Sequence, residues 1–393
     1  MTSIFNKISD YSYRKDYTLK YYQNEYATKN RKNNEKIVSY ILSDECLDDI
    51  KRISKGDIFF KAPIMNKISK GEGRYRHVFC YEYKETALLS LIVRALFDKY
   101  DYIFSDNLYS YRSSRTNYDV FKKIVSIKDI KTLYALKVDV SEYDKCIDKT
   151  TLKEIIEARI DEKEMTNFLC RFIELDKYIY KDEEYFDKQA VRAGCPLTPF
   201  LENLYLIDYD EKIISKCNSY FRFNDDILIY GTKEQIDECF LFTKDYFLKK
   251  KLILNENKIK IVSPNEEISF LGMRINGDVD ISFAIINNIK RLLTNKVHTI
   301  LSFKRQLGLS DDLAMSFMLE YEKKLYPYLQ LLFGRITKLD GIRKIDNIMQ
   351  DCLRYVGSGK FNKKRYKIKY KTLQELGYVP LVSIYYKWEW KKK

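Results

Sequence analysis

Two patterns of apolar and polar residues run along the chain, and each predicts a different kind of element. Apolar residues spaced three and four positions apart predict helices, and these cover 84–102, 152–175, 199–215, 286–307, 311–333 and 342–355. Gly308 and Gly334 follow two of these stretches as stop signals. Runs rich in β-branched and aromatic residues predict strands at 132–138 and on both sides of Asn224-Asp225. Asn and Asp favour tight turns, so this second region is predicted to be a hairpin.

Carboxylates stand at the ends of these predicted strands. Asp225 and Asp226 are adjacent at the hairpin tip, where an isolated pair would ordinarily be a solvated turn. Asp139 directly follows the strand 132–138 and can face the same tip. Three Asp from two strands would form an oxygen-only site suited to Mg²⁺. Two such ions can activate an attacking hydroxyl and stabilise the leaving oxygen of a phosphoryl transfer, which is polymerase chemistry.

Seven motifs in order, between about residues 60 and 285, resemble those of a reverse transcriptase. They are 70–76 (KGEGRYR), 109–115 (YSYRSSR), 139–148, 194–203, 223–226 (FNDD), 252–258 and 270–272 (FLG). Any one of these motifs is weak evidence, whereas the ordered set is specific. The chain is most similar to bacterial abortive-infection and unclassified-group reverse transcriptases. That resemblance implies antiphage defence, a dedicated structured non-coding RNA and often oligomers.

The resemblance implies roles for the acidic residues and their neighbours. Asp139, Asp225 and Asp226 would bind two Mg²⁺ ions, with help from the carbonyl of Val140. Lys258 would place a proton or a positive charge near the departing pyrophosphate, and a surface salt bridge is the alternative.

The resemblance also implies contacts with the incoming nucleotide. Arg76 is the favoured clamp on the triphosphate because a guanidinium offers phosphate a bidentate fork. Lys70 is the second choice, and Arg74 is interpreted as an exposed hairpin charge. Gly194 would let the backbone approach the nucleotide or template, and Phe223 replaces the family's Tyr. The segment 270–272 is predicted to form the primer-grip turn, with a plain strand end as the alternative.

Two departures from the family pattern concern nucleotide choice. Many relatives carry Gln at the position of Ala193. Relatives also place an aromatic five residues after the first catalytic Asp, to exclude the 2′-hydroxyl, and here that residue is Asp144. An Asp at this spacing is similar to the pattern of RNA-dependent RNA polymerases. If the alignment with the family shifts by one residue, Tyr143 becomes the aromatic residue that excludes the 2′-hydroxyl. Deoxynucleotides are the favoured substrate, and ribonucleotides are the open alternative.

Composition sets wider limits. The 393 residues are 45% hydrophobic and carry a net charge of +14, which suits a polyanionic partner such as RNA. Eight scattered Cys and two His make a zinc site or a disulfide framework improbable. A signal peptide and a membrane span are not expected, because long apolar runs are missing. The expected location is therefore cytoplasmic.

The C-terminal segment is basic and rich in aromatic residues. Residues 360–393 contain eleven Lys or Arg against two Glu. The aromatic residues between them include Tyr366, Tyr370, Tyr385, Tyr386, Trp388 and Trp390. Such a segment can follow a phosphate backbone and stack on bases. A solubilising tail that packs partly on the preceding helices is the alternative.

These observations predict an α+β right-hand polymerase with a palm built from an antiparallel sheet and helices. The predicted parts are an N-terminal extension (1–60), fingers (61–133), a palm that includes part of the fingers near 150–190 (134–285), and a helical thumb-like region with the basic tail (286–393). The predicted function is RNA-templated DNA synthesis from deoxynucleoside triphosphates, with a homo-oligomer or a second subunit as further partners. Retron and group II intron enzymes, and a polymerase-shaped RNA-binding subunit, are the alternatives.

Overall fold

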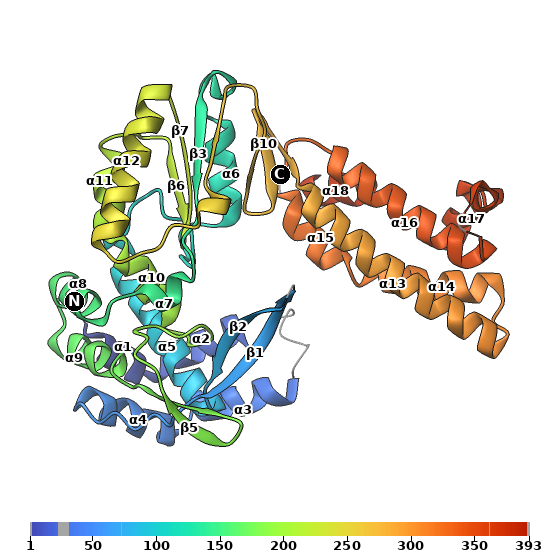
Figure 1. The fold of residues 1–393 in the computed structure, drawn as a ribbon. Helices are drawn as coiled ribbons and strands as arrows, with labels where there is room; N and C mark the ends of the chain where they lie inside the picture. Colours follow the sequence, from blue (N-terminus) through green and yellow to red (C-terminus); the bar gives the residue numbers. More distant parts are fainter. Residues whose placement is uncertain (1, 23–30, 72, 361, 391–393) are drawn as a thin grey trace. The chain divides into compact units, whose positions relative to one another are not determined.

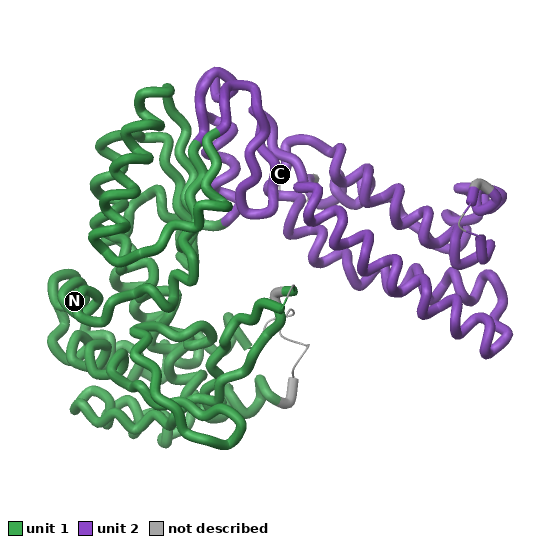
Figure 2. The backbone as a smooth tube through the Cα atoms, viewed as in Figure 1, with its two compact units in different colours: residues 1–116, 136–261 green, residues 117–135, 262–393 purple. Residues whose placement is uncertain are grey.

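The fold is α+β, as predicted (Figure 1). The structure is a computed structural model that describes residues 2–22, 31–71, 73–360 and 362–390. It forms two compact units, coloured separately in Figure 2. The first unit comprises Met1–Thr116 and Leu136–Ile261, and the second comprises Asn117–Ala135 and Val262–Lys393. The four predicted parts of the chain stay a prediction, because these units divide the chain at other points.

The first unit begins with short helices gathered around one long buried helix. The N-terminal segments are α1 (Ile4–Ser9), α2 (Tyr11–Tyr21), α3 (Arg31–Ile41) and α4 (Asp44–Ser54). The long helix α5 (Tyr83–Tyr100) matches the predicted helix 84–102 and contacts both α1 and α3. Its apolar positions Leu88, Leu89, Ile92 and Leu96 are completely buried. The apolar spacing seen in the sequence therefore marks a core helix.

Two predicted helices of the first unit are each divided in the structure. The range 152–175 contains α8 (Lys149–Arg159) and α9 (Lys163–Phe172), and the range 199–215 contains α10 (Thr198–Tyr205) and α11 (Ile207–Ile214). Glu162 lies at the first break, where it accepts a hydrogen bond from the Ile4 amide at 2.7 Å and pairs with Lys99 at 2.6 Å. This tertiary contact explains why the helix stops where the local pattern would continue. The remaining helices are α7 (Tyr143–Cys146) and α12 (Lys233–Lys249).

Two four-stranded sheets complete this part of the chain. The first has the order β2-β1-β4-β5, with β1 (Ile64–Gly71), β2 (Arg74–Cys80), β4 (Lys177–Tyr180) and β5 (Glu183–Phe186). The second has the order β6-β7-β3-β8, with β6 (Tyr220–Phe223), β7 (Asp226–Gly231), β3 (Tyr134–Val138) and β8 (Lys260–Val262). The predicted strand 132–138 and the predicted hairpin around Asn224 are both confirmed.

The second unit combines a small sheet with packed helices. Its sheet has the order β11-β10-β9, with β9 (Ile268–Phe270), β10 (Met273–Asn276) and β11 (Asp278–Ile281). Its helices are α6 (Asn117–Val125), α13 (Phe283–Leu307), α14 (Asp311–Lys323), α15 (Tyr326–Phe333), α16 (Asp340–Ser358), α17 (Tyr370–Glu375) and α18 (Leu381–Trp390). The predicted helix 311–333 is thus divided into α14 and α15. Gly308 caps α13 with a left-handed φ of 62°, as its stop signal predicted.

The turn between β9 and β10 is tight, as predicted for 270–272. Phe270 pairs with Met273, so only Leu271 and Gly272 form the connection. Both take positive φ, 46° and 79° respectively. A Cβ on Gly272 would lie 2.7 Å from the end of the Ile285 side chain, so a larger residue would require that side chain to move. The role of this turn as a primer grip stays a prediction.

The basic tail is helical, and some of its aromatic residues pack while others are exposed. The rings of Tyr385 and Trp388 lie 5.4 and 5.8 Å from the ring of Phe333. Tyr366 and Tyr386, by contrast, expose about half of their surface. Some side chains of the tail therefore pack on the preceding helices, as one prediction requires. Others are exposed and available to stack on bases, as the other prediction requires. Among the helices that the structure describes, none has the length and apolarity needed to cross a membrane.

One buried carboxylate in the helical part carries a stability prediction. Glu322 of α14 is completely buried, and among the described residues neither of its carboxylate oxygens has a hydrogen-bond partner. Burial, aided by the charge of Asp346, raises the pKa of Glu322 well above its usual range. Because the folded pKa exceeds the unfolded one, the stability contribution of the protonated group is fully present below about pH 4.5 and is lost as the pH rises from there through the folded pKa.

We therefore expect Glu322→Gln to raise the melting temperature more at pH 8 than at pH 5. The amide cannot ionise, so the variant avoids the cost of burying a charge at high pH. Thermal unfolding of the full chain at both pH values measures the difference. Glu320→Gln, at an exposed position of the same helix, should change little at either pH. An equal gain for Glu322→Gln at both pH values would contradict the assignment.

Candidate active site

The hairpin β6-β7 carries Asp225 on a two-residue turn. Phe223 pairs directly with Asp226, which leaves Asn224 and Asp225 as the connection. Asn224 adopts a left-handed φ of 58°, which Asn tolerates better than most residues. Its side-chain amide donates to the Asp225 carboxylate at 3.3 Å. The turn predicted from the sequence thus places Asp225 and Asp226 side by side in the chain and at the end of the sheet.

A fully buried arginine fixes the backbone of this turn. Arg222 of β6 and Asp210 of α11 are both completely buried and form a two-pronged ion pair at 2.7 and 2.5 Å. The remaining Arg222 donors reach the carbonyl of Asn224 at 3.0 Å and that of Asn203 at 3.2 Å. The ion pair therefore couples the helical layer to the tip of the hairpin. Sequence reasoning missed Asp210, although a charged residue inside an apolar strand is a signal that a partner must exist.

A second set of hydrogen bonds holds the turn from the segment 109–115. The backbone amide of Asn224 donates to the Ser110 hydroxyl at 2.9 Å, and that hydroxyl donates to the side-chain carbonyl of Asn203 at 2.8 Å. Asn203 in turn donates to the Ser110 carbonyl at 3.0 Å. Both Ser110 and Asn203 are completely buried. Three motifs distant in sequence therefore meet at one turn.

Asp139 follows β3 and is bound by the segment that precedes β8. Lys258 donates to both carboxylate oxygens of Asp139 at 2.9 Å, and the side chain of Asn255 donates at 3.1 Å. Two main-chain hydrogen bonds flank Val140. The Asn255 amide donates to the Asp139 carbonyl at 2.9 Å, and the Ser141 amide donates to the Ile253 carbonyl at 2.7 Å. This bridge does not use the Val140 carbonyl, which leaves it available for the predicted role. The salt bridge proposed as the alternative role of Lys258 is present, and its partner is Asp139 itself.

The three predicted metal ligands influence one another electrostatically. Burial raises the pKa of Asp225 to about 6, and the neighbouring charges of Asp226 and Asp139 add to the increase. Burial also raises the pKa of Asp226, while Lys137, 3.7 Å away, opposes the increase. Gathered anionic oxygens of this kind suit a divalent cation chemically. In the part of the chain that is described, however, three such groups do not come together as a ready-made metal cluster. Lys137 and Lys258 instead pair with two of the carboxylates.

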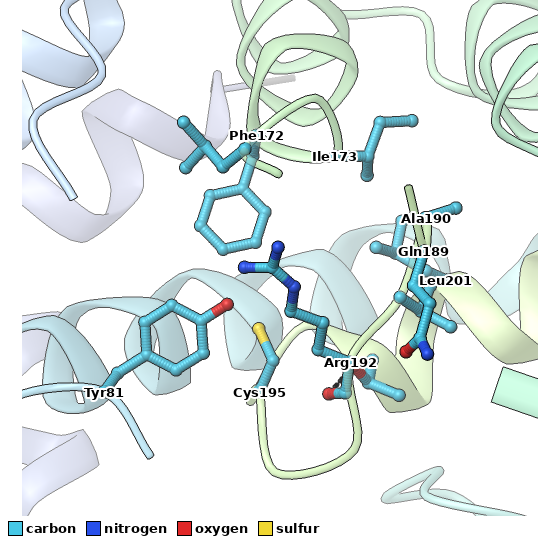
Figure 3. A pocket seen from close by; sticks show the side chains of 11 residues that line it. Tyr81, Phe172, Ile173, Gln189, Ala190, Arg192, Cys195 and Leu201 are labelled. Atoms are coloured by element: carbon cyan, nitrogen blue, oxygen red, sulfur yellow. Dashed lines mark hydrogen bonds between the residues drawn. The ribbon is translucent and has the colours of Figure 1, made fainter. Parts of the chain in front are cut away.

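The loop around Gly194 is packed tightly against β2. The Phe79 amide donates to the Ala193 carbonyl at 2.8 Å, and Arg192 donates to the Lys177 carbonyl at 3.0 Å. Figure 3 shows the guanidinium of Arg192 pointing toward the rings of Phe172 and Tyr81 in a small pocket. Gly194 itself has a φ of 99°, and a Cβ there would lie 2.6 Å from the Phe79 carbonyl. The close packing requires glycine here, a reason that the sequence did not reveal.

We expect Gly194→Ala to lower the free energy of unfolding by about 3 kcal/mol, through backbone strain and overpacking together. Gly377→Ala is the matched control, because Gly377 has a similar φ of 96° with nothing within 4 Å of its missing Cβ. That variant should lose only about 1 kcal/mol. Denaturant unfolding compares the two variants. Equal losses of unfolding free energy in the two variants would mean that the close approach of the added Cβ to the Phe79 carbonyl does not destabilise the fold.

The position predicted to gate the sugar is acidic, and the neighbouring aromatic is turned inward. Tyr143 is buried, and its hydroxyl donates to the carbonyl of Glu202 at 2.7 Å. Asp144 follows it in the short helix α7 and is partly exposed. This hydrogen bond fixes the orientation of the Tyr143 ring. The role of Tyr143 or Asp144 as the residue that selects the sugar stays a prediction.

Glu202 is a buried carboxyl that sequence reasoning missed. It belongs to α10 and is 5% exposed. Burial raises the pKa of Glu202 to about 8, with the charges of Asp144 and Asp225 adding to the increase. The Asn224 amide and the positive charge of Arg76 oppose it. Its sequence signal was a charged residue between the buried Leu201 and Asn203.

Comparison with known proteins identifies the family. The family model described as "Reverse transcriptase (RNA-dependent DNA polymerase)" matches residues 68–275, more than half of the chain. The chain belongs to this family. Reverse transcriptases are RNA-directed DNA polymerases, a class of nucleotidyltransferase, and generally use divalent metals, typically Mg²⁺. A search of curated proteins found no match.

Solved telomerase structures are similar to this reverse transcriptase at low identity. An apo telomerase from Candida Tropicalis, truncated from its C-terminal domain, is 14% identical with a TM-score of 0.45, over 57% of this chain and 55% of that one. The chain therefore spans about half the length of that structure. A telomerase from Candida albicans in complex with a TWJ fragment of telomeric RNA is 12% identical with a TM-score of 0.45, over 90% of this chain and 68% of that one.

The structure describes the side chains of only some of the remaining predicted site residues. Arg76 is exposed in β2, and its positive charge opposes the increase in the pKa of Glu202. Phe223 is partly buried, with its ring 6.1 Å from that of Tyr111. The side chain of Lys70 lies outside the described residues. The roles of all three in nucleotide binding stay predictions.

Proposed function

We propose that this reverse transcriptase adds deoxynucleotides to a primer end at Asp139, Asp225 and Asp226. The observation that carries the proposal is the placement of these carboxylates, since Asp225 and Asp226 lie at the turn between β6 and β7 and Asp139 follows β3, which pairs with β7 in the same sheet. Together with the Val140 carbonyl, they would hold two Mg²⁺ ions. These ions would supply activation of the primer hydroxyl and stabilisation of the leaving oxygen.

The other residues of the site would position the substrate and balance its charge. Arg76 would clamp the triphosphate of the incoming nucleotide, with Lys70 as a second cation. Lys258 holds Asp139 at 2.9 Å and would meet the departing pyrophosphate from the same place. The buried Arg222 would keep the turn in place while the charges around it change. Described contacts support the roles of Lys258 and Arg222, whereas the roles of Arg76 and Lys70 are proposed from the resemblance.

We further propose that the chain serves bacterial antiphage defence in the cytoplasm, with a dedicated non-coding RNA. The helical C-terminal region supports this assignment, because in it the chain resembles abortive-infection and unclassified-group enzymes. The exposed Tyr366 and Tyr386 of the basic tail support RNA contact, because exposed rings between cations can stack on bases. A homo-oligomer or a second protein subunit belongs to the same proposal.

The test is to purify the chain from cells of its source and sequence the RNA and DNA that copurify. One abundant structured RNA, with DNA complementary to it, is the expected result. An Asp225→Asn chain prepared in parallel should retain the RNA and lose the DNA. RNA without DNA from the unaltered chain would favour the RNA-binding subunit, and recovery of a branched RNA–DNA product or an intron would favour the retron or intron enzyme.

A further inference from the structure

A small cavity beside the loop that carries Gly194 contains a single charged side chain, that of Arg192 (Figure 3). Arg192 is 4% exposed, and every other residue that lines the cavity is uncharged. Its guanidinium lies over the ring of Phe79 at 5.2 Å, and its Nη1 donates to the Lys177 carbonyl at 3.0 Å. Among the residues that the structure describes, it has no ion-pair partner. A guanidinium keeps its proton in proteins, and a buried charge without a counter-charge is costly, so an anion would stabilise this position.

The open edge of this guanidinium is the edge that binds carboxylates elsewhere in the chain. Nε and Nη2 of Arg192 have no hydrogen-bond partner among the described residues. These two atoms point to the same side of the planar group and bind an anion together as a fork. Arg222 uses the same two atoms on Asp210, at 2.7 and 2.5 Å. Arg112 uses them on Asp101, at 2.7 and 3.0 Å. Arg192 presents this edge to the cavity instead of to a carboxylate of the described residues.

Two groups beside the guanidinium could carry a negative charge, but both are neutral. Figure 3 shows the hydroxyl of Tyr81 and the thiol of Cys195 next to the guanidinium. Burial raises the pKa of Tyr81 well above its usual value, although the charge of Arg192 opposes the increase. Burial also raises the pKa of Cys195 to about 11. Near neutral pH these groups can therefore donate hydrogen bonds to an anion, but they cannot neutralise the guanidinium.

The size of the cavity limits which anion can enter. Its volume is about 10 Å³, and a site for one water molecule needs about 10–15 Å³. A chloride ion is only slightly larger than a water molecule, whereas a carboxylate, phosphate or sulfate spreads its charge over several oxygen atoms. A water molecule would satisfy the two open donors but would leave the charge uncompensated. The cavity therefore favours a single-atom anion.

We propose that Nε and Nη2 of Arg192 bind one chloride-sized anion in this cavity. The carbonyl of Arg192 accepts hydrogen bonds from the Cys195 amide at 3.0 Å and from the Thr198 hydroxyl at 2.7 Å. Through these bonds the anion stabilises the loop that carries Gly194 and the beginning of α10. The inference does not depend on the proposed polymerase function, because it uses none of the residues assigned to metal or nucleotide.

The experiment compares the melting temperature of the full chain in potassium chloride, bromide and gluconate at equal ionic strength. Gluconate is too large for the cavity, and equal ionic strength keeps general screening constant. We expect chloride or bromide at about 200 mM to raise the melting temperature by about 2–4 °C relative to gluconate, with the saturation that a single site requires. Bromide also scatters anomalously, so in a crystal soaked with bromide we expect an anomalous peak beside Nε and Nη2 of Arg192.

Arg192→Met should remove the difference between chloride and gluconate, because the fork is gone. Arg305→Met, at an exposed position of α13, is the matched control and should keep the full difference. If Arg192→Met does not fold, the bromide peak in the unaltered chain decides the question alone. Equal melting temperatures in chloride and gluconate, or a bromide soak without a peak at Arg192, would overturn the inference. A chloride effect that persists in Arg192→Met would place the ion elsewhere and overturn it as well. None of these results bears on primer extension, so a failure here leaves the proposed function untouched.

Discussion

Asp225→Asn is expected to reduce primer extension by at least about 1,000-fold while leaving the fold intact. Loss of a supporting residue around a metal typically costs 10- to 100-fold, and loss of a direct ligand should cost more. Asparagine keeps the shape of the turn, and its carbonyl can still accept from the side chain of Asn224. Single-turnover extension with Mg²⁺ on an RNA template measures the loss.

The stability of the same variant separates a catalytic role from a structural one. Asp225 stands near the charges of Asp226 and Asp139, which disfavour its ionised form. Removing its charge should therefore leave the melting temperature unchanged or raise it. Asp182→Asn, on the exposed turn between β4 and β5, is the control and should keep full activity. Extension that persists in Asp225→Asn would refute the assignment, and a large fall in melting temperature would reassign Asp225 to a structural role.

The second large effect is expected for the buried ion pair. Asp210→Ala should lower the free energy of unfolding by about 3–5 kcal/mol, because it leaves the guanidinium of Arg222 charged and uncompensated in the interior. Denaturant unfolding followed by circular dichroism measures the change. Asp245→Ala is the control, since its pair with Lys249 on α12 is exposed and should contribute less than about 1 kcal/mol.

The double variant Asp210→Leu with Arg222→Met tests whether the ion pair contributes only to stability or also positions the turn for activity. Apolar replacements of a buried ion pair are often neutral or stabilising, so most of the lost stability should return. Activity should stay low, because the Asn224 carbonyl loses its donor and the turn is no longer held. A double variant that regains both stability and activity would show that Arg222 does not position the turn.

Much of the fold follows from local patterns. The strand at 134–138 and the hairpin around Asn224 were predictable because β-branched and aromatic runs flank a turn-forming pair. Helix positions followed from apolar spacing, but three predicted helices are divided. The break near Glu162 depends on contacts with Ile4 and Lys99, which are distant in sequence. No local pattern contains that information.

The site was predictable in its residues and less so in its contacts. Ordered motifs located Asp139 and Asp225, because each motif has a fixed place in the family. The partner of Arg222 could not be assigned, since Asp210 lies in a separate helix twelve positions away. The orientation of Tyr143 depends on the backbone at the start of α7, where Glu142 takes a left-handed φ of 46°. Packing determines a backbone conformation of that kind, and the residue types alone do not predict it.

The two-residue connection at Asn224 and Asp225 also limits how this enzyme can change. Side chains alternate between the two faces of a strand, so one inserted or deleted residue would exchange the faces of β7 relative to β6. Ile227 and Ile229 would then exchange faces with the equally buried Leu228, and the packing on both faces of β7 would be disrupted. Evolution can therefore alter the identity of residues in this turn but not its length. The β4–β5 hairpin, whose residues are largely exposed, has no such restriction.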